Sequence, residues 1–220
     1  SSDVLVKLRE DYRDRTKVVW RVYFGNGTSL TDAEVVRSVY DLKDSNCSEL
    51  QYLEDVKYAD FGHDEYLNDS SFLSGMKSLE VLIISGSPIK DLSPLSACKN
   101  LRILEIANCG YITDLSPLED CESLEMLNIS HTKATEGLSA LEERNITHLT
   151  AVGGIWNKIS QEDRDAFQED HPDCWIVTSG NEYGVGWRYE DKETKMEWYE
   201  KASEAFKYPH APNNVGWYLE

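Results

Sequence analysis

Cysteine and histidine are the side chains in this sequence that could act as nucleophiles or metal ligands. Five cysteines stand at positions 47, 98, 109, 121 and 174, and five histidines at 63, 131, 148, 171 and 210. Zinc sites, hydrolases and nucleotide-binding proteins carry signatures such as C-x-x-C, H-E-x-x-H, G-x-S-x-G or a P-loop. None of these occurs in the sequence. We therefore expect no metal, no cofactor and no enzymatic activity.

The charge of the chain restricts its partners. Forty acidic residues against 22 basic ones give a formal net charge of −18, which repels phosphate backbones and anionic lipid headgroups. No apolar run approaches the ~20 residues that cross a bilayer. We expect neither nucleic acid binding nor membrane insertion, and we interpret the acidic stretch at 160–170 as a solvated helix face.

A repeat of 22 to 23 residues organises the middle of the chain. The pattern L-x-x-L-x-L recurs, with a weak last copy and a degenerate first one, at Leu53-Val56-Tyr58, Leu79-Leu82-Ile84, Leu101-Leu104-Ile106, Leu124-Leu127-Ile129 and Ile146-Leu149-Ala151. Each copy predicts a short strand with alternate residues inward. In "LSPL", Ser93 or Ser116 could cap a short helix with Pro94 or Pro117 at its first position. Such coils bury their leucines only by stacking.

The repeats "LEVLIISGSPIKDLSPL" and "LRILEIANCGYITDLSPL" resemble the bacterial leucine-rich repeats of the internalin type, L-x-x-L-x-L-x-x-N-x-I-x-D-I-S-P-L. The resemblance covers roughly residues 53 to 152. It implies an α/β fold: a right-handed leucine-rich repeat solenoid with parallel strands on the concave face, short helices or turns on the convex side, and caps at both ends. The family's asparagine position holds Ser87, Cys109, Thr132 and Gly154 here.

The repeat pattern also gives the cysteines a structural role. Cys109 falls on the ladder position, where a small thiol packs in the narrow inner turn. Cys98 and Cys121 occupy equivalent L-x-x-C-x-x-L positions and should face inward. Because stacked coils bring equivalent positions close together, a disulfide between them is left open.

We expect one domain in three parts. Residues 1–52 should form an N-terminal βα cap, with a strand at 16–24 and a helix at 31–42 that begins with Thr31 and Glu34 as a capping box. Residues 53–178 should hold about six repeats, the last with a helix capped by Ser160 and a strand that turns Ile176 inward. Residues 179–220, rich in Trp and Tyr, should form a C-terminal cap with a helix at about 192–207.

The outward side chains of the strands should form the docking surface. In the first rung Asp55 and Lys57 should point outward, and in the following rungs an exposed apolar patch should be rimmed by polar side chains, as interfaces commonly are. The predicted ligand-binding residues are Val81, Ile83, Ile103, Glu105, Met126, Asn128, His131 and His148.

These observations favour a monomeric, non-enzymatic module that binds a protein or peptide on its concave face. The resemblance implies a secreted or cell-surface bacterial protein. Two alternatives remain open: an intracellular regulatory scaffold with the same fold, and a glycan-binding protein that uses C-terminal aromatics such as Trp187 and Trp217.

Overall fold

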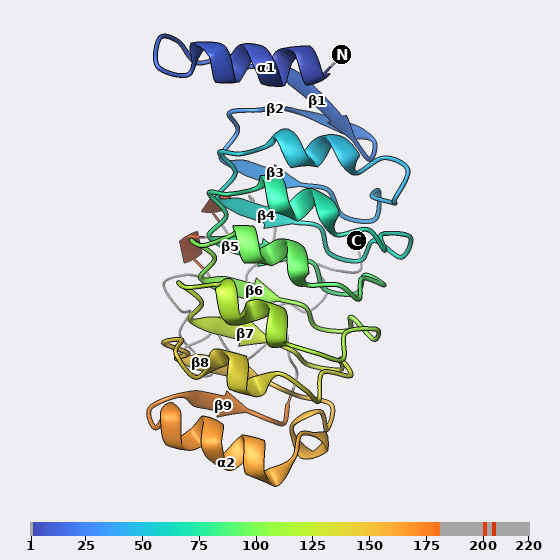
Figure 1. The fold of residues 1–220 in the computed structure, drawn as a ribbon. Helices are drawn as coiled ribbons and strands as arrows, with labels where there is room; N and C mark the ends of the chain where they lie inside the picture. Colours follow the sequence, from blue (N-terminus) through green and yellow to red (C-terminus); the bar gives the residue numbers. More distant parts are fainter. Residues whose placement is uncertain (1, 181–199, 202–203, 206–220) are drawn as a thin grey trace.

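A parallel sheet of three-residue strands forms one side of the molecule. The structure is a computed structural model that describes residues 2–180, 200–201 and 204–205. Within these residues the sheet order follows the chain from β3 to β9 (Figure 1). The strands are β3 (Val35–Arg37), β4 (Tyr58–Asp60), β5 (Val81–Ile83), β6 (Ile103–Glu105), β7 (Met126–Asn128), β8 (His148–Thr150) and β9 (Trp175–Val177). This arrangement confirms the predicted solenoid.

Short 3-10 helices return the chain on the opposite side of each coil (Figure 1). They are η1 (Ser48–Tyr52), η2 (Ser71–Gly75), η3 (Ser93–Ala97), η4 (Ser116–Asp120), η5 (Leu138–Leu141) and η6 (Trp156–Lys158). The expected serine caps of η3 and η4 are wrong. Asp91 Oδ1 accepts from Ser93 N and Asp114 Oδ1 from Ser116 N, each at 2.8 Å, because an aspartate bonds readily to the amide two residues on.

One inward side chain per strand builds the core. The register aligns Val36, Ala59, Leu82, Leu104, Leu127, Leu149 and Ile176 across the sheet. Leu82, Leu104 and Leu127 are all 0 to 1% exposed. Stacking therefore removes from water the leucine faces that a single coil would expose, as the repeat pattern predicted.

The N-terminal part differs from the prediction. The chain begins with helix α1 (Ser2–Tyr12), followed by an antiparallel hairpin of β1 (Arg21–Phe24) and β2 (Gly27–Leu30). The predicted helix at 31–42 is wrong, since β3 occupies this segment and pairs Val36 with Ala59 of β4. Two adjacent β-branched valines suit a strand, and pairing with the next coil outweighs the local helical pattern.

The first predicted rung is out of register by three residues. Tyr58 pairs with Val81 and Ala59 with Leu82, so the inward residues are Val56, Ala59 and Phe61, all fully buried. The outward residues of β4 are consequently Tyr58 and Asp60 instead of the expected Asp55 and Lys57.

The C-terminal coil follows the prediction closely. Ser160 Oγ accepts from Asp163 N at 3.0 Å and so caps α2 (Gln161–Asp170), and β9 aligns Ile176 with Leu149. The predicted cap at 179–220 lies outside the described residues after Gly180, except for residues 200, 201, 204 and 205, which are helical. In the part of the chain described, no helix has the length and apolar character to cross a membrane.

Candidate functional site

The outward residues of the strands form two columns, which we call the concave sheet face. The middle residue of each strand points into the solenoid, so the first and third residues point away from it. The register gives a first column of Val35, Tyr58, Val81, Ile103, Met126, His148 and Trp175, and a second of Arg37, Asp60, Ile83, Glu105, Asn128, Thr150 and Val177. This face is the candidate functional site.

Seven of the eight predicted binding residues lie on the concave sheet face, and the register brings them together on strands β5 to β8. The exception is His131, which lies three residues after β7 in a turn. Its φ of 57° is left-handed, and the residue is exposed. His131 is therefore placed off the sheet.

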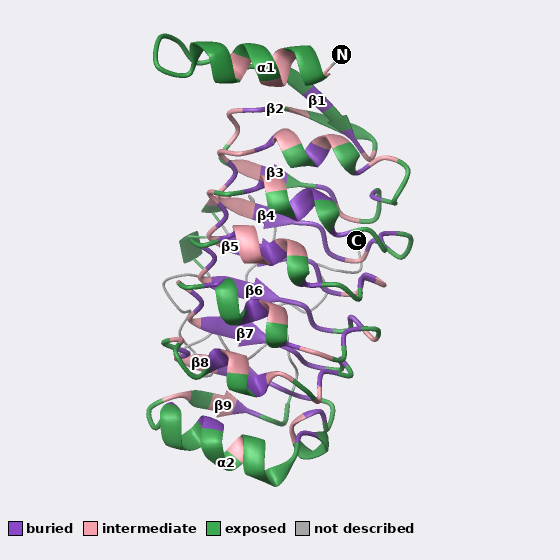
Figure 2. Cartoon of the chain, in the orientation of Figure 1, coloured by how far each residue is buried: buried purple, intermediate pink, exposed green. Residues whose placement is uncertain are grey.

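The expected exposure of the apolar patch is wrong. Val81 and Ile103 are 0%, Ile83 1% and Met126 5% exposed, and Figure 2 shows β6 and β7 as buried. None of these four belongs to the contiguous cluster that fills the solenoid interior. The sequence indicated which way the side chains point, but a strand's own residues do not determine what lies over them.

Polar side chains on this face have hydrogen-bond or ion-pair partners. Glu105 is 0% exposed and accepts from Ser85 Oγ at 3.3 Å. Asn128 Oδ1 accepts from Ser130 N at 3.0 Å. On β4, the buried Asp60 pairs with Arg37 Nε at 3.3 Å. Buried charges need such partners because burial without them is strongly unfavourable.

The end of the face at β8 and β9 is aromatic and partly open. The rings of His148 and Trp175 meet edge to face, with centroids 5.4 Å apart. His148 is half-buried, and Trp175 remains 37% exposed. Sequence reasoning did not single out Trp175, although its place one coil after His148 could have identified it.

A column of left-handed residues turns the chain after each strand. Tyr40, His63, Gly86, Asn108, His131 and Gly153 all have φ between 57° and 81° and recur every 22 or 23 residues. A Cβ on Gly153 would overlap the His131 ring. Asn and Gly tolerate this conformation best, so their spacing was an overlooked signal. His131 thus occupies the left-handed turn position of its coil and is not part of the concave sheet face.

The cysteines form part of the core wall. Cys98, Cys109 and Cys121 are fully buried, and their thiols donate to carbonyls of the preceding coil, Leu73 at 3.4 Å, Ile84 at 3.3 Å and Leu95 at 3.5 Å. All five cysteines are free thiols, so Cys98 and Cys121 are not bonded. Burial raises the pKa of these three thiols to about 12. Because the thiolate is the reactive form, they are chemically inert near neutral pH.

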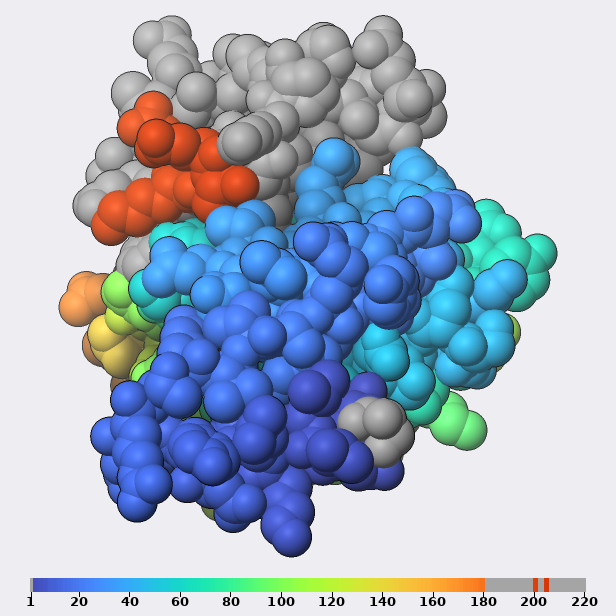
Figure 3. Space-filling view, turned by 90° about the horizontal axis from the view of Figure 1, so that it is seen from above, coloured from blue at the N-terminus to red at the C-terminus, as the bar shows by residue number. Residues whose placement is uncertain are grey.

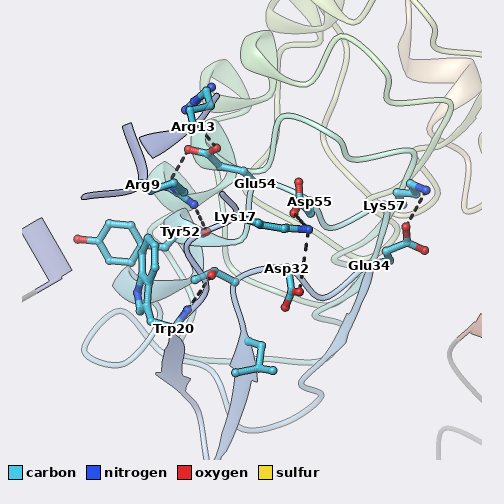
Figure 4. Close-up of polar contacts among 12 residues, drawn as sticks. Arg9, Arg13, Lys17, Trp20, Asp32, Glu34, Tyr52, Glu54, Asp55 and Lys57 are labelled. Atoms are coloured by element: carbon cyan, nitrogen blue, oxygen red, sulfur yellow. Dashed lines mark hydrogen bonds and ion pairs between the residues drawn. The ribbon is translucent and has the colours of Figure 1, made fainter. Parts of the chain in front are cut away.

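A second concave region joins α1 to the solenoid (Figure 4). It is a cavity of about 360 Å³ lined in part by Arg9, Arg13, Lys17, Glu54 and Asp55. Glu54 pairs with Arg9 at 2.8 Å and with Arg13 at 3.8 Å, while Lys17 pairs with Asp55 at 2.9 Å. Cations and anions offset one another here. We call these ion pairs of Arg9, Arg13 and Lys17 with Glu54 and Asp55 the clasp. They attach the N-terminal segment to the solenoid, since α1 itself has no buried residue.

The described residues contain no group of three or more His, Cys, Asp or Glu side chains placed to hold a metal ion. What the geometry offers is a sheet face with an apolar middle and an aromatic end.

The fold is that of a leucine-rich repeat solenoid, and it is similar to the solenoids of several bacterial leucine-rich repeat proteins. Residues 77–120 match the family model described as Leucine Rich repeats (2 copies). A leucine-rich repeat protein of Leptospira interrogans is 22% identical, with a TM-score of 0.51 over 59% of this chain and 33% of that one. The functional domain of InlJ from Listeria monocytogenes, whose structure is described as including a cysteine ladder, is 14% identical. Its TM-score is 0.52 over 69% of this chain and 40% of that one.

An internalin, InlF, from Listeria monocytogenes is also similar, at 14% identity over 80% of this chain and 55% of that one, with a TM-score of 0.45. The chain thus spans between a third and a little over half of the length of these proteins. The sequence matches no curated protein. Leucine-rich repeat folds of this kind are protein-binding scaffolds and are generally not enzymes.

Proposed function

We propose that this chain is a non-enzymatic module that binds a protein or peptide segment on the concave sheet face. The observation that carries the proposal is the continuous apolar stripe of Val81, Ile83, Ile103 and Met126. These residues point away from the core and yet are apolar. A sheet face meant for water alternates apolar and polar residues, so this one is suited to being covered.

The partner should present apolar or aromatic side chains. Neighbouring strands lie ~4.8 Å apart, so Val81, Ile103 and Met126 form a row that a single segment can follow. At its end stands Trp175, 37% exposed and of the type that most often anchors interfaces. The chain's charge of −18 disfavours a strongly acidic partner.

The internalin-type repeat pattern supports a secreted or cell-surface location for this binding module. The intracellular scaffold and the glycan-binding protein are not favoured by any described residue, and Trp187 and Trp217 lie outside the described residues. Protease treatment of intact cells, followed by detection of the chain, tests the location. Resistance to the protease until the cells are lysed would argue for the scaffold.

The test of the binding face compares two charge-equivalent variants. Met126→Lys places an ammonium group on the concave sheet face, and Tyr66→Lys places one at a site that is 71% exposed and off the sheet. Proteins captured by immobilised wild-type chain are identified by mass spectrometry, and circular dichroism verifies the fold. A partner retained by Tyr66→Lys and lost by Met126→Lys supports the proposal. Equal capture by all three chains refutes it.

A further inference from the structure

The middle of the concave sheet face is covered in the free chain. Val81, Ile83 and Ile103 are at most 1% exposed although they point away from the solenoid interior. The 3-10 helices lie on the other side of the coils (Figure 1). A sheet in a single layer cannot bury its own outer face, so another segment must lie over it.

A described part of the C-terminal segment lies beside this face. Residues 200, 201, 204 and 205 are helical, and Figures 1 and 3 show them in red next to the N-terminal coils. Burial and the neighbouring Glu80 raise the pKa of Tyr58, and the ammonium group of Lys201 acts in the opposite direction. Lys201 is therefore close to Tyr58, which stands in the first column beside Val81.

The chain between Gly180 and Lys201 is long enough to run along the concave sheet face. Gly180 follows β9, and Lys201 lies near β4, five strands away, which is about 24 Å at ~4.8 Å per strand. The 21 intervening steps could span up to about 70 Å. The direct route from β9 to β4 passes β8, β7, β6 and β5, and on β5, β6 and β7 the outer face is buried.

We infer that the C-terminal segment, residues 181–220, is the occupant of the concave sheet face and lies across Val81, Ile103 and Met126. Its composition fits this role, because nine of its 40 residues are aromatic. Aromatic side chains bury the most apolar area per residue. The apolar row thus has an intramolecular ligand.

The function proposed above, together with this docking, implies that a partner and the C-terminal segment compete for the concave sheet face. A partner that binds the same face must displace the segment, and its apparent affinity falls in proportion to the fraction of chains that are open. The partner would then resemble the segment that it replaces: a peptide rich in aromatic residues. The docking itself does not depend on the existence of any partner.

Photo-crosslinking in the full-length chain tests the docking directly. A benzophenone amino acid at Ile103 should insert into residues 181–220 of the same chain, giving a product of monomer mass whose linked peptide is identified by mass spectrometry. The same probe at the exposed Tyr66 should give no such product. Crosslinks to a second copy, or linked peptides only from residues before 181, would overturn the inference.

A second probe position covers the case in which the benzophenone at the buried Ile103 disrupts the fold. Trp175 is partly exposed on the same face, so an aromatic benzophenone replaces it without new burial, and it should also link to residues 181–220. No such link from either position overturns the inference. Partner capture separates the two proposals. If the links form but Met126→Lys captures all that the wild-type chain does, the proposed function fails and the docking stands.

Discussion

Replacing Asp64 with asparagine should stabilise the protein above about pH 7. Asp64 stands three residues after Phe61, on the ladder position of its coil, and is 1% exposed. Its Oδ1 accepts from Leu42 N at 2.9 Å, whereas Oδ2 is buried with no hydrogen-bond partner among the described residues. Burial raises the pKa of this carboxyl to about 7, although the Leu42 amide acts in the opposite direction.

The size of the effect on the free energy of unfolding follows from the difference between the folded and unfolded pKa values of Asp64. The ordinary pKa is 3.8 and the folded value is about 7, so the folded state holds the proton in this window while the unfolded state has lost it. Asp64 therefore destabilises the fold progressively as pH rises from about 4 to 7. Above pH 7 the full effect reaches an upper limit of about 4 kcal/mol, at 1.36 kcal/mol per pKa unit. Asparagine keeps the Oδ1 acceptor and carries no charge at any pH.

Urea unfolding at about pH 5 and pH 8 measures the effect. The free energy of unfolding of Asp64→Asn minus that of the wild-type protein should increase by about 2 to 3 kcal/mol between the two pH values. Glu65→Gln is the matched control, because it removes one carboxylate from the exposed neighbouring residue. A difference that does not depend on pH, or an equal gain in Glu65→Gln, would refute the reasoning.

Three further predictions concern packing, thiols and the clasp. Gly75→Ala should lower the free energy of unfolding by about 1 to 3 kcal/mol, because the new Cβ would overlap the Gln51 carbonyl. Gly110→Ala, with no atom within 4 Å of its Cβ, should change it by less than about 0.5 kcal/mol, and urea unfolding measures both variants. A thiol reagent at about pH 8 should modify only the half-buried Cys174 in the folded chain and all five cysteines in denaturant; a second reactive thiol before unfolding would contradict this. Glu54→Gln should remove ion pairs to α1 worth about 1 kcal/mol, speeding amide exchange in α1 roughly fivefold but not in β6. Unchanged exchange in α1 would show that the clasp is not what holds it.

The alignment of the coils could be predicted from the sequence because burial requires it. Each coil must present a leucine-type residue at the same place to cover its neighbour, so the spacing of Leu82, Leu104 and Leu127 directly determines the register that the structure shows. The positions of Cys98, Cys109 and Cys121 followed from the same repeat. All three are buried as predicted.

Two predictions from the sequence failed because the structure of the segment depends on contacts with residues far away in the chain. The segment at 31–42 has a local helical pattern, and only the edge of β4 makes Val35 and Val36 a strand. Similarly, the direction of Val81 and Ile103 could be read from alternation, but their burial could not, because it depends on contacts beyond the strand itself. The role of Asp91 was missed for a local reason: its carboxylate accepts from the backbone amide of Ser93 two residues on, a contact that the search for a serine cap did not consider.

One overlooked signal bears on both proposals. Strands buried on two faces have continuous apolar runs, while strands with one wet face alternate. β5, with Val81, Leu82 and Ile83, is continuous, whereas β4 and β8 carry polar residues at their outward positions, Asp60 and Thr150 among them. The apolar character is thus concentrated at the middle of the sheet. A partner and the C-terminal segment would compete for that same short stretch, so a single charge at Met126 should weaken both.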